Sequence, residues 1–201
     1  MQKQLFYIHG GDAYLTHEAF LEDLQNRTLR DPYGEGGVRW TDTLRPKLGE
    51  RYEIFTPKMP CKENAKYEEW KVWFERHIPY LGERVTVLGW SLGGIFFAKY
   101  LSENEVPFTI ERLYLLAAPF NSEDLCDVAC GDFVLDPELI AKLPEKVGQI
   151  VLMHSKDDFV VPYEHGLVYQ ALLLTAELVT FEDKNHFLIE EFPELIERLQ
   201  A

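Results

Sequence analysis

A serine between two glycines is the residue of this sequence with the clearest capacity for chemistry. Ser91 is the centre of Gly-Trp-Ser-Leu-Gly, residues 89–93, which joins the apolar run Val85–Leu88 to a stretch of helical periodicity. This spacing between a strand and a helix is typical of a nucleophile elbow, a tight turn that exposes the serine hydroxyl. The flanking glycines let neighbouring backbones approach, and the helix N-terminus presents free N–H groups to an anion. The pattern predicts that Ser91 is a nucleophile.

Serine becomes a good nucleophile when a base removes its proton, and the sequence offers a base and an acid in a suitable order. Asp157 and Asp158 follow the apolar run Ile150–His154. His186 follows the run Glu177–Phe181. Serine, acid and histidine in that chain order, each in a loop after a strand, can form a catalytic triad. We predict that His186 takes the serine proton and that an aspartate orients its imidazole.

The identity of the acid stays open on these residues alone. Asp157 and Asp158 are adjacent in the same loop, and either can fill the role. The loop after the preceding predicted strand offers Asp124 and Asp127 as further alternatives.

Three other histidines have predicted roles outside the triad. His154 lies within a buried predicted strand, where we expect a hydrogen-bonded core residue. His165 lies in the first turn of a predicted helix, and we expect it to be solvated. His9 precedes Gly10 and Gly11 in a turn, and we expect its side chain to bond the loop that shapes the anion site.

Six short apolar runs alternate with segments of helical periodicity, and this alternation predicts a parallel α/β sheet. The third to fifth runs are continuously apolar, which is typical of strands covered on both faces. The predicted strands are Leu5–Ile8, Tyr52–Phe55, Val85–Leu88, Arg112–Leu116, Ile150–His154 and Glu177–Phe181. The predicted helices include residues 17–28, Tyr67–Leu81, Leu92–Leu101 and Phe192–Leu199, with Phe96 and Phe97 as core residues.

Two intervals, residues 12–50 and 119–148, interrupt this alternation without being large enough to form domains. Excursions from the carboxyl ends of strands carry substrate contacts in α/β enzymes, so we expect substrate-binding structure there. The second interval contains Cys126 and Cys130. Together with Cys61, we interpret these as reduced thiols and expect no metal site.

Length and composition predict one globular domain over residues 1–201. Apolar residues make up 46% of the chain, which is not a disordered composition. The formal charge of −14 argues against nucleic-acid and anionic membrane partners. The apolar run near the N-terminus is too short for a signal peptide, and no stretch approaches the roughly 20 apolar residues of a membrane span. We therefore expect a cytoplasmic protein.

These motifs together resemble those of the α/β-hydrolase superfamily. The resemblance spans nearly the whole chain and rests on His9-Gly-Gly11, Gly89-Trp-Ser-Leu-Gly93, Asp158-Phe-Val-Val-Pro162 and Asn185-His186-Phe187. It implies a three-layer α/β/α sandwich with a mostly parallel sheet of about six strands, in the order 2-1-3-4-5-6, and a minimal lid. In that superfamily the acid commonly precedes a short hydrophobic run that ends in proline, which assigns the role to Asp158. The short chain and residues 117–120, Ala-Ala-Pro-Phe, are most similar to the compact retinoblastoma-binding-protein-9-type serine hydrolases.

The resemblance also implies where substrate atoms bind. The backbone N–H groups of Leu92 and Gly11 are expected to hold the oxyanion that forms during attack, with the N–H of Asp12 as the alternative to Gly11. Trp90 replaces the histidine or tyrosine that is more common beside the nucleophile, and we expect it to pack in the core or to narrow the acyl pocket. Phe120, at the end of the fourth predicted strand, is the stronger pocket candidate.

We therefore expect a cofactor-free serine hydrolase that cleaves a small soluble ester, or a thioester or amide, with an esterase favoured over a peptidase. The acidic surface should disfavour anionic substrates unless the charge is inverted locally. One rival interpretation is a protein-binding module that retains the hydrolase scaffold with little turnover. Another is acyl transfer from the same site to an alcohol or thiol.

Overall fold

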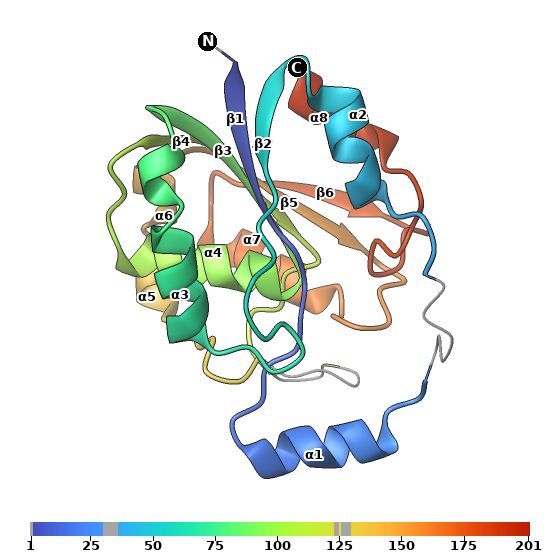
Figure 1. Ribbon diagram of the computed structural model, residues 1–201. Coiled ribbons are helices and arrows are strands. Elements are labelled where there is room, and N and C mark those ends of the chain that lie inside the picture. The colour runs from blue at the N-terminus through green and yellow to red at the C-terminus, as the bar shows by residue number, and fades with distance from the viewer. Residues whose placement is uncertain (1, 30–35, 123–124, 126–129) are drawn as a thin grey trace.

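Six parallel strands form one sheet in the order β2-β1-β3-β4-β5-β6 (Figure 1). The structure is a computed structural model that describes residues 2–29, 36–122, 125 and 130–201. The predicted strand order is confirmed, and each predicted strand overlaps its counterpart. Because neighbouring strands are parallel, their carboxyl ends meet at one edge of the sheet. The strands are β1 (Lys3–Ile8), β2 (Tyr52–Phe55), β3 (Arg84–Trp90), β4 (Thr109–Leu116), β5 (Val147–Ser155) and β6 (Glu177–Phe181).

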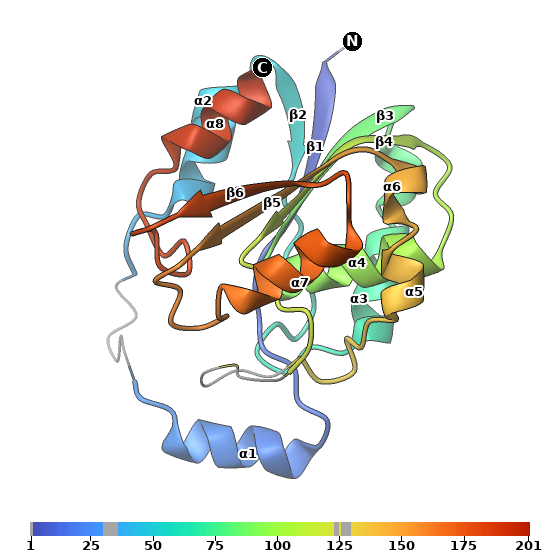
Figure 2. The ribbon, with the colours of Figure 1, turned by 180° about the vertical axis from the view of Figure 1, so that it is seen from behind.

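Helices cover both faces of the sheet and complete three layers (Figures 1 and 2). One face carries α3 (Tyr67–Glu75), α4 (Leu92–Glu103), α5 (Pro137–Ile140), α6 (Leu143–Lys146) and α7 (Glu164–Leu172). The other face carries α2 (Leu44–Leu48) and α8 (Pro193–Gln200), and α1 (His17–Asn26) lies apart from the sheet with no buried residue. The described residues also form the short 3₁₀ helices η1 (Trp40–Thr43) and η2 (Ile78–Tyr80). In the described ranges no helix is both long enough and apolar enough to cross a lipid bilayer.

A separate hydrophobic cluster lies on each face of the sheet. Along β1, Phe6 and Ile8 join the cluster under α3 and α4, whereas Leu5 and Tyr7 join the cluster under α2 and α8. Side chains of a strand point alternately to its two faces, so a strand covered on both sides must be apolar throughout. The continuously apolar pattern of the sequence is explained by this double burial.

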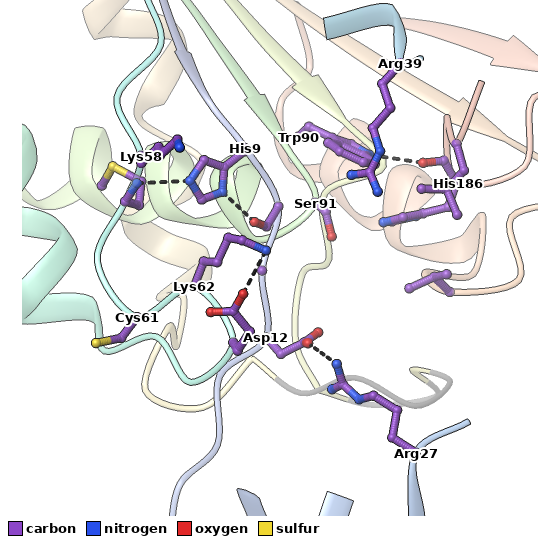
Figure 3. Close-up of a pocket in the computed structure, with 16 residues that line it drawn as sticks. His9, Asp12, Arg27, Arg39, Lys58, Cys61, Lys62, Trp90, Ser91 and His186 are labelled. Carbon is purple, nitrogen blue, oxygen red and sulfur yellow. Dashed lines mark hydrogen bonds and ion pairs between the residues drawn. The ribbon is translucent and has the colours of Figure 1, made fainter. Parts of the chain in front are cut away.

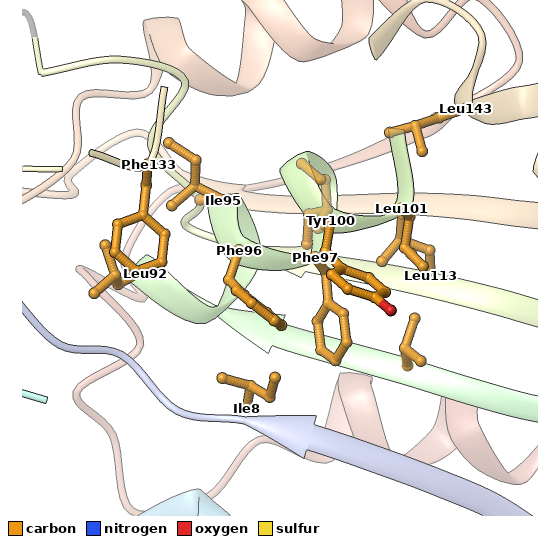
Figure 4. Close-up of a cluster of buried hydrophobic side chains, with 14 of the residues drawn as sticks. Ile8, Leu92, Ile95, Phe96, Phe97, Tyr100, Leu101, Leu113, Phe133 and Leu143 are labelled. Carbon is orange, nitrogen blue, oxygen red and sulfur yellow. The ribbon is translucent and has the colours of Figure 1, made fainter. Parts of the chain in front are cut away.

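Helix α4 begins directly after Ser91 and is buried along most of its length (Figure 4). Phe96 and Phe97 have no exposed surface, which confirms their predicted place in the core. The Phe97 ring meets the Phe74 ring edge-on, with 5.6 Å between the centroids. Close packing of these buried rings holds α4 in place, and the N-terminus of this helix faces the candidate site.

One predicted helix is wrong in its extent. The helix expected over Tyr67–Leu81 ends at Glu75, and a short 3₁₀ turn, Ile78–Tyr80, follows. Pro79 lies inside that turn. Proline lacks an N–H group and disfavours helical backbone in the residue before it. The α-helix therefore ends before Pro79, although apolar residues continue at helical spacing beyond its end.

Removing the Phe97 ring should destabilise the fold through the core cavity that it leaves. We expect Phe97→Ala to lower the free energy of unfolding by about 3–5 kcal/mol, measured by urea denaturation with circular dichroism. Val72, on the exposed side of α3, is the matched control, because Val72→Ala should change that free energy by less than about 1 kcal/mol. Equal losses in the two variants would contradict the packing described for α4.

Candidate active site

Ser91 lies at the sharp turn between β3 and α4. Its backbone has φ 54° and ψ −121°, a conformation that residues other than glycine rarely adopt. The turn is held because the Ser91 N–H donates to the Leu116 carbonyl at 2.8 Å. A Cβ on Gly89 would lie 2.4 Å from the Gly93 oxygen, and one on Gly93 would lie 2.3 Å from the Ile8 oxygen. Both glycines of the motif are therefore required by close backbone approach.

His186 and Asp158 meet at the carboxyl edge of the sheet. Nδ1 of His186 lies 2.9 Å from Oδ2 and 3.1 Å from Oδ1 of the Asp158 carboxylate, and both side chains are buried. The backbone N–H groups of Val160 and Val161 each donate to Asp158 Oδ1 at 2.9 Å. This contact directs the other ring nitrogen, Nε2, away from the carboxylate.

The Asp158 carboxylate is held in its ionised form. Burial by itself raises the pKa of this group, but hydrogen bonds from His154 and His186, and the charge of His186, outweigh it. The net result lowers the pKa of Asp158 from 3.8 to about 2. His154 is a buried residue whose Nε2 donates to the Val161 carbonyl at 2.8 Å, so the predicted hydrogen-bonded core role is confirmed.

Asp157, the other aspartate of the pair, fixes the loop that carries His186. Its Oδ1 accepts the Asn185 N–H at 2.8 Å and the Ser155 hydroxyl at 2.5 Å. The Ser155 oxygen in turn accepts the Lys184 N–H at 3.0 Å. The two adjacent carboxylates therefore bind different groups: Asp158 contacts the His186 ring, and Asp157 accepts the backbone N–H of the preceding residue, Asn185. The alternatives Asp124 and Asp127, like Cys126, lie outside the described residues.

Two tryptophans support the same loop from the other side. Trp90 Nε1 donates to the His186 carbonyl at 3.0 Å, and its ring lies 5.8 Å from the imidazole centroid. Trp40 Nε1 donates to the Phe187 carbonyl at 3.1 Å, and the two indoles meet edge-on at 6.1 Å. Trp90 is almost fully buried and also lines the cavity described next. The core packing predicted for Trp90 is confirmed, and its contact with an acyl group stays a prediction.

A cavity of about 760 Å³ opens beside the serine (Figure 3). Ser91 and His186 both line it, together with Trp90. In the described part of the chain no hydrogen bond joins the Ser91 hydroxyl to the His186 ring. Such contacts are often loose without substrate and tighten in the reacting complex. The two groups line the same cavity.

Two backbone N–H groups are available beside Ser91. Leu92 is the first residue of α4, so its N–H has no partner within the helix. Gly11 lines the cavity, and no hydrogen bond uses its N–H in the described chain. The N–H of Asp12, the alternative donor, already donates to the Lys62 carbonyl at 2.8 Å. Gly11 and Asp12 are the two candidates for the second N–H donor to the oxyanion, and of these Gly11 has the available N–H group.

His9 braces this turn, as predicted. Its Nε2 accepts the Met59 N–H at 2.9 Å, and Nδ1 therefore carries the proton and donates to the Gly10 carbonyl at 2.6 Å. Burial lowers the pKa of His9, which favours the neutral ring that this pattern needs. The residues 9–11 are thereby tied to the segment after β2.

Two predictions around β4 and α7 need revision. His165 is buried rather than solvated, because its ring turns towards the loop after β4 and Nδ1 accepts the Phe120 N–H at 3.0 Å. The Phe120 ring packs edge-on against Tyr169, 5.2 Å between centroids, and does not belong to the cavity lining. A pocket role for Phe120 is not confirmed. The described residues of 119–148 likewise contribute no lining side chain.

The cavity wall also includes residues that the sequence analysis missed. Four of them, Lys58, Met59, Lys62 and Glu63, follow β2, while Arg27 and Arg39 come from the interval 12–50. This places part of the first interval at the cavity, and its contact with substrate stays a prediction. The segment after β2 leaves the carboxyl end of the edge strand that pairs with β1, and the strand order predicted for the sheet was the signal that could have placed it near the site.

Comparison with known proteins gives likeness in structure only. Neither the protein-family models nor the curated protein sequences contain a match to this chain. The ydeN gene product of B. subtilis matches with a TM-score of 0.76 at 19% identity, over 99% of this chain and 97% of that one. A meta-cleavage product hydrolase from Pseudomonas fluorescens matches with a TM-score of 0.69 at 15% identity, over 98% and 89% of the two chains.

A serine hydrolase from Cycloclasticus zankles matches with a TM-score of 0.64 at 15% identity, over all of this chain and 89% of that one. At identities this low, the structural similarity establishes the fold alone, and the chemistry has to be inferred from the residues of this chain. The sheet order, the crossover helices and these neighbours together show that the chain has the α/β-hydrolase fold.

Proposed function

We propose that this chain is a cofactor-independent serine hydrolase that cleaves a small ester through an acyl-enzyme. The observation that carries the proposal is the buried Asp158–His186 contact beside the cavity that also contains Ser91. An ionised carboxylate on Nδ1 leaves Nε2 of the imidazole free to accept a proton. The strained backbone of Ser91 adds support, because such strain is typical of functional positions.

The proposed reaction proceeds in two acyl-transfer steps. Ser91 Oγ attacks the carbonyl carbon while His186 Nε2 takes the hydroxyl proton, and the ester C–O bond breaks as His186 returns that proton to the leaving alcohol. A water then attacks the acyl-enzyme while His186 takes a proton from it. The bond between Ser91 Oγ and the acyl carbon breaks as His186 returns that proton to the serine, which releases the carboxylic acid. The N–H groups of Leu92 and Gly11 hold the oxyanion in both steps, each contributing about 3 kcal/mol of transition-state stabilisation.

The same site chemistry extends to thioesters and amides, and we favour esters. The fold neighbours include a meta-cleavage product hydrolase and a serine hydrolase, which supports hydrolysis over non-catalytic binding. Our proposal also covers a small-molecule substrate, a cytoplasmic location, a single domain, and kinship with the compact retinoblastoma-binding-protein-9-type hydrolases. The last rests on chain length and on residues 117–120.

A fluorophosphonate probe tests the nucleophile. We expect the wild-type protein to be labelled and to hydrolyse short p-nitrophenyl esters, and Ser91→Ala to lose both, because the probe requires an activated serine. Circular dichroism verifies that the variant is folded. Labelling that persists in Ser91→Ala would refute Ser91 as the nucleophile. A wild-type protein without labelling or hydrolysis would instead favour the binding-module interpretation.

The adjacent aspartates give a matched pair of variants. Asp158→Asn should lower kcat on the order of 10³- to 10⁴-fold, because an amide cannot stabilise the imidazolium and favours the wrong tautomer. Asp157→Asn keeps an oxygen that accepts the Asn185 N–H, so we expect less than about a tenfold loss. Steady-state kinetics on one ester compares the two. A larger loss in Asp157→Asn would contradict the assignment of the acid.

The low pKa of Asp158 also predicts how stability depends on pH. Because the folded pKa of about 2 lies below the reference value of 3.8, the ionised group stabilises the folded state above about pH 4. That contribution is lost as the pH falls towards 2. Between about pH 5 and about pH 3 the wild type should lose about 1 kcal/mol more unfolding free energy than Asp158→Asn. Parallel pH profiles from urea denaturation would show that the carboxylate is not held in this way.

A further inference from the structure

The candidate site has the opposite charge balance from the rest of the protein. The chain carries a formal charge of −14, yet the described residues of the cavity wall include four basic side chains and two acidic ones. The basic side chains are Arg27, Arg39, Lys58 and Lys62, and the acidic ones are Asp12 and Glu63. Local inversion of this kind attracts anions into a concave site even on an acidic protein. The general expectation that an acidic surface disfavours anionic substrates therefore does not extend to this cavity.

Two of the four cations are already neutralised within the protein. Arg27 lies 2.8 Å from the Asp12 carboxylate and 2.7 Å from that of Asp23. Lys62 lies 2.9 Å from the Glu63 carboxylate. These pairs use both acidic side chains that the described residues contribute to the wall. Among those lining residues, no further carboxylate is left for the other two cations.

Arg39 and Lys58 are the cations without such a partner. Neither side chain forms an ion pair or a hydrogen bond within the ranges that the structure describes. Both residues are exposed where they line the cavity. Figure 3 shows the Arg39 side chain extending from its backbone towards the space between Ser91 and His186, whereas Lys58 lies on the far side, next to His9.

The backbone of Arg39 is anchored to the same loop that positions His186. Its N–H donates to the Asp42 carboxylate at 2.9 Å. The next residue, Trp40, is buried and donates its backbone N–H to the Ile189 carbonyl at 3.0 Å and its indole N–H to Phe187. The start of the Arg39 side chain is therefore fixed relative to the imidazole, which is the condition for binding a substrate group at a set distance from the cleaved bond.

We propose that the substrate carries a carboxylate close to the cleaved bond and that Arg39 binds it, with Lys58 adding electrostatic attraction from the opposite wall. This inference rests on the proposed hydrolase function and names its substrate class. A guanidinium presents parallel N–H donors that match the two oxygens of a carboxylate. Lys58 supplies a point charge, whose role is attraction rather than alignment.

Matched pairs of esters test the proposal on either side of the cleaved bond. Mono-p-nitrophenyl adipate and p-nitrophenyl hexanoate differ by a carboxylate in the acyl group. Para-acetoxybenzoate and its methyl ester differ by a carboxylate in the leaving group. For at least one pair we expect the ratio of kcat/KM, acidic over neutral ester, to fall about 10- to 100-fold in Arg39→Gln, mainly through KM. Arg76→Gln, on an exposed arginine outside the cavity, should keep the wild-type ratio.

The outcomes separate this inference from the proposed function. If the wild type hydrolyses the esters and both ratios are unchanged in Arg39→Gln, the carboxylate site is refuted while the hydrolase stands. If the wild type is neither labelled by a fluorophosphonate nor active on any ester, the proposed hydrolase function is refuted, and the carboxylate site that rests on it is refuted as well. A ratio that falls equally in Arg76→Gln would trace the effect to overall charge and would also overturn the role of Arg39.

Discussion

The contact between the Asp158 carboxylate and Nδ1 of His186 is the interaction on which the candidate site depends. It joins loops after β5 and β6, so it can form only when those parallel strands are in register. Burial would normally disfavour a charge at this place, and the pair persists because imidazole and backbone N–H donors surround the carboxylate. The geometry of one ring thus depends on the alignment of two strands.

Much of the surrounding structure serves to hold the backbone of His186. Asp157 and Ser155 bind the residues before it, and Trp90 and Trp40 bind its carbonyl and the next one. Asn185 and Phe187, on either side, both have positive φ. A histidine held by backbone contacts on both sides loses little entropy when it takes up a proton-transfer geometry.

Residues with a local sequence signature were predictable. The elbow glycines at 89 and 93 and the order of serine, acid and histidine follow from short-range sequence patterns. The strand order follows from the resemblance to the α/β-hydrolase superfamily that those motifs carry. Burial of His165 and the position of Phe120 were not predictable, because each depends on how the loop after β4 packs against α7, which is distant in sequence. The cationic cavity wall was missed for the same reason: net charge is a sum over the chain, whereas Arg39 and Lys58 become neighbours of Ser91 only in three dimensions.

A crystal structure of the protein after reaction with a fluorophosphonate is the most direct test of the central claim. The account predicts a phosphonyl group bonded to Ser91 Oγ, with its oxygen within about 2.7–3.1 Å of the Leu92 and Gly11 nitrogens and His186 Nε2 facing the same phosphorus centre. An adduct on another residue, or a His186 ring that remains out of reach of the modified serine, would contradict it.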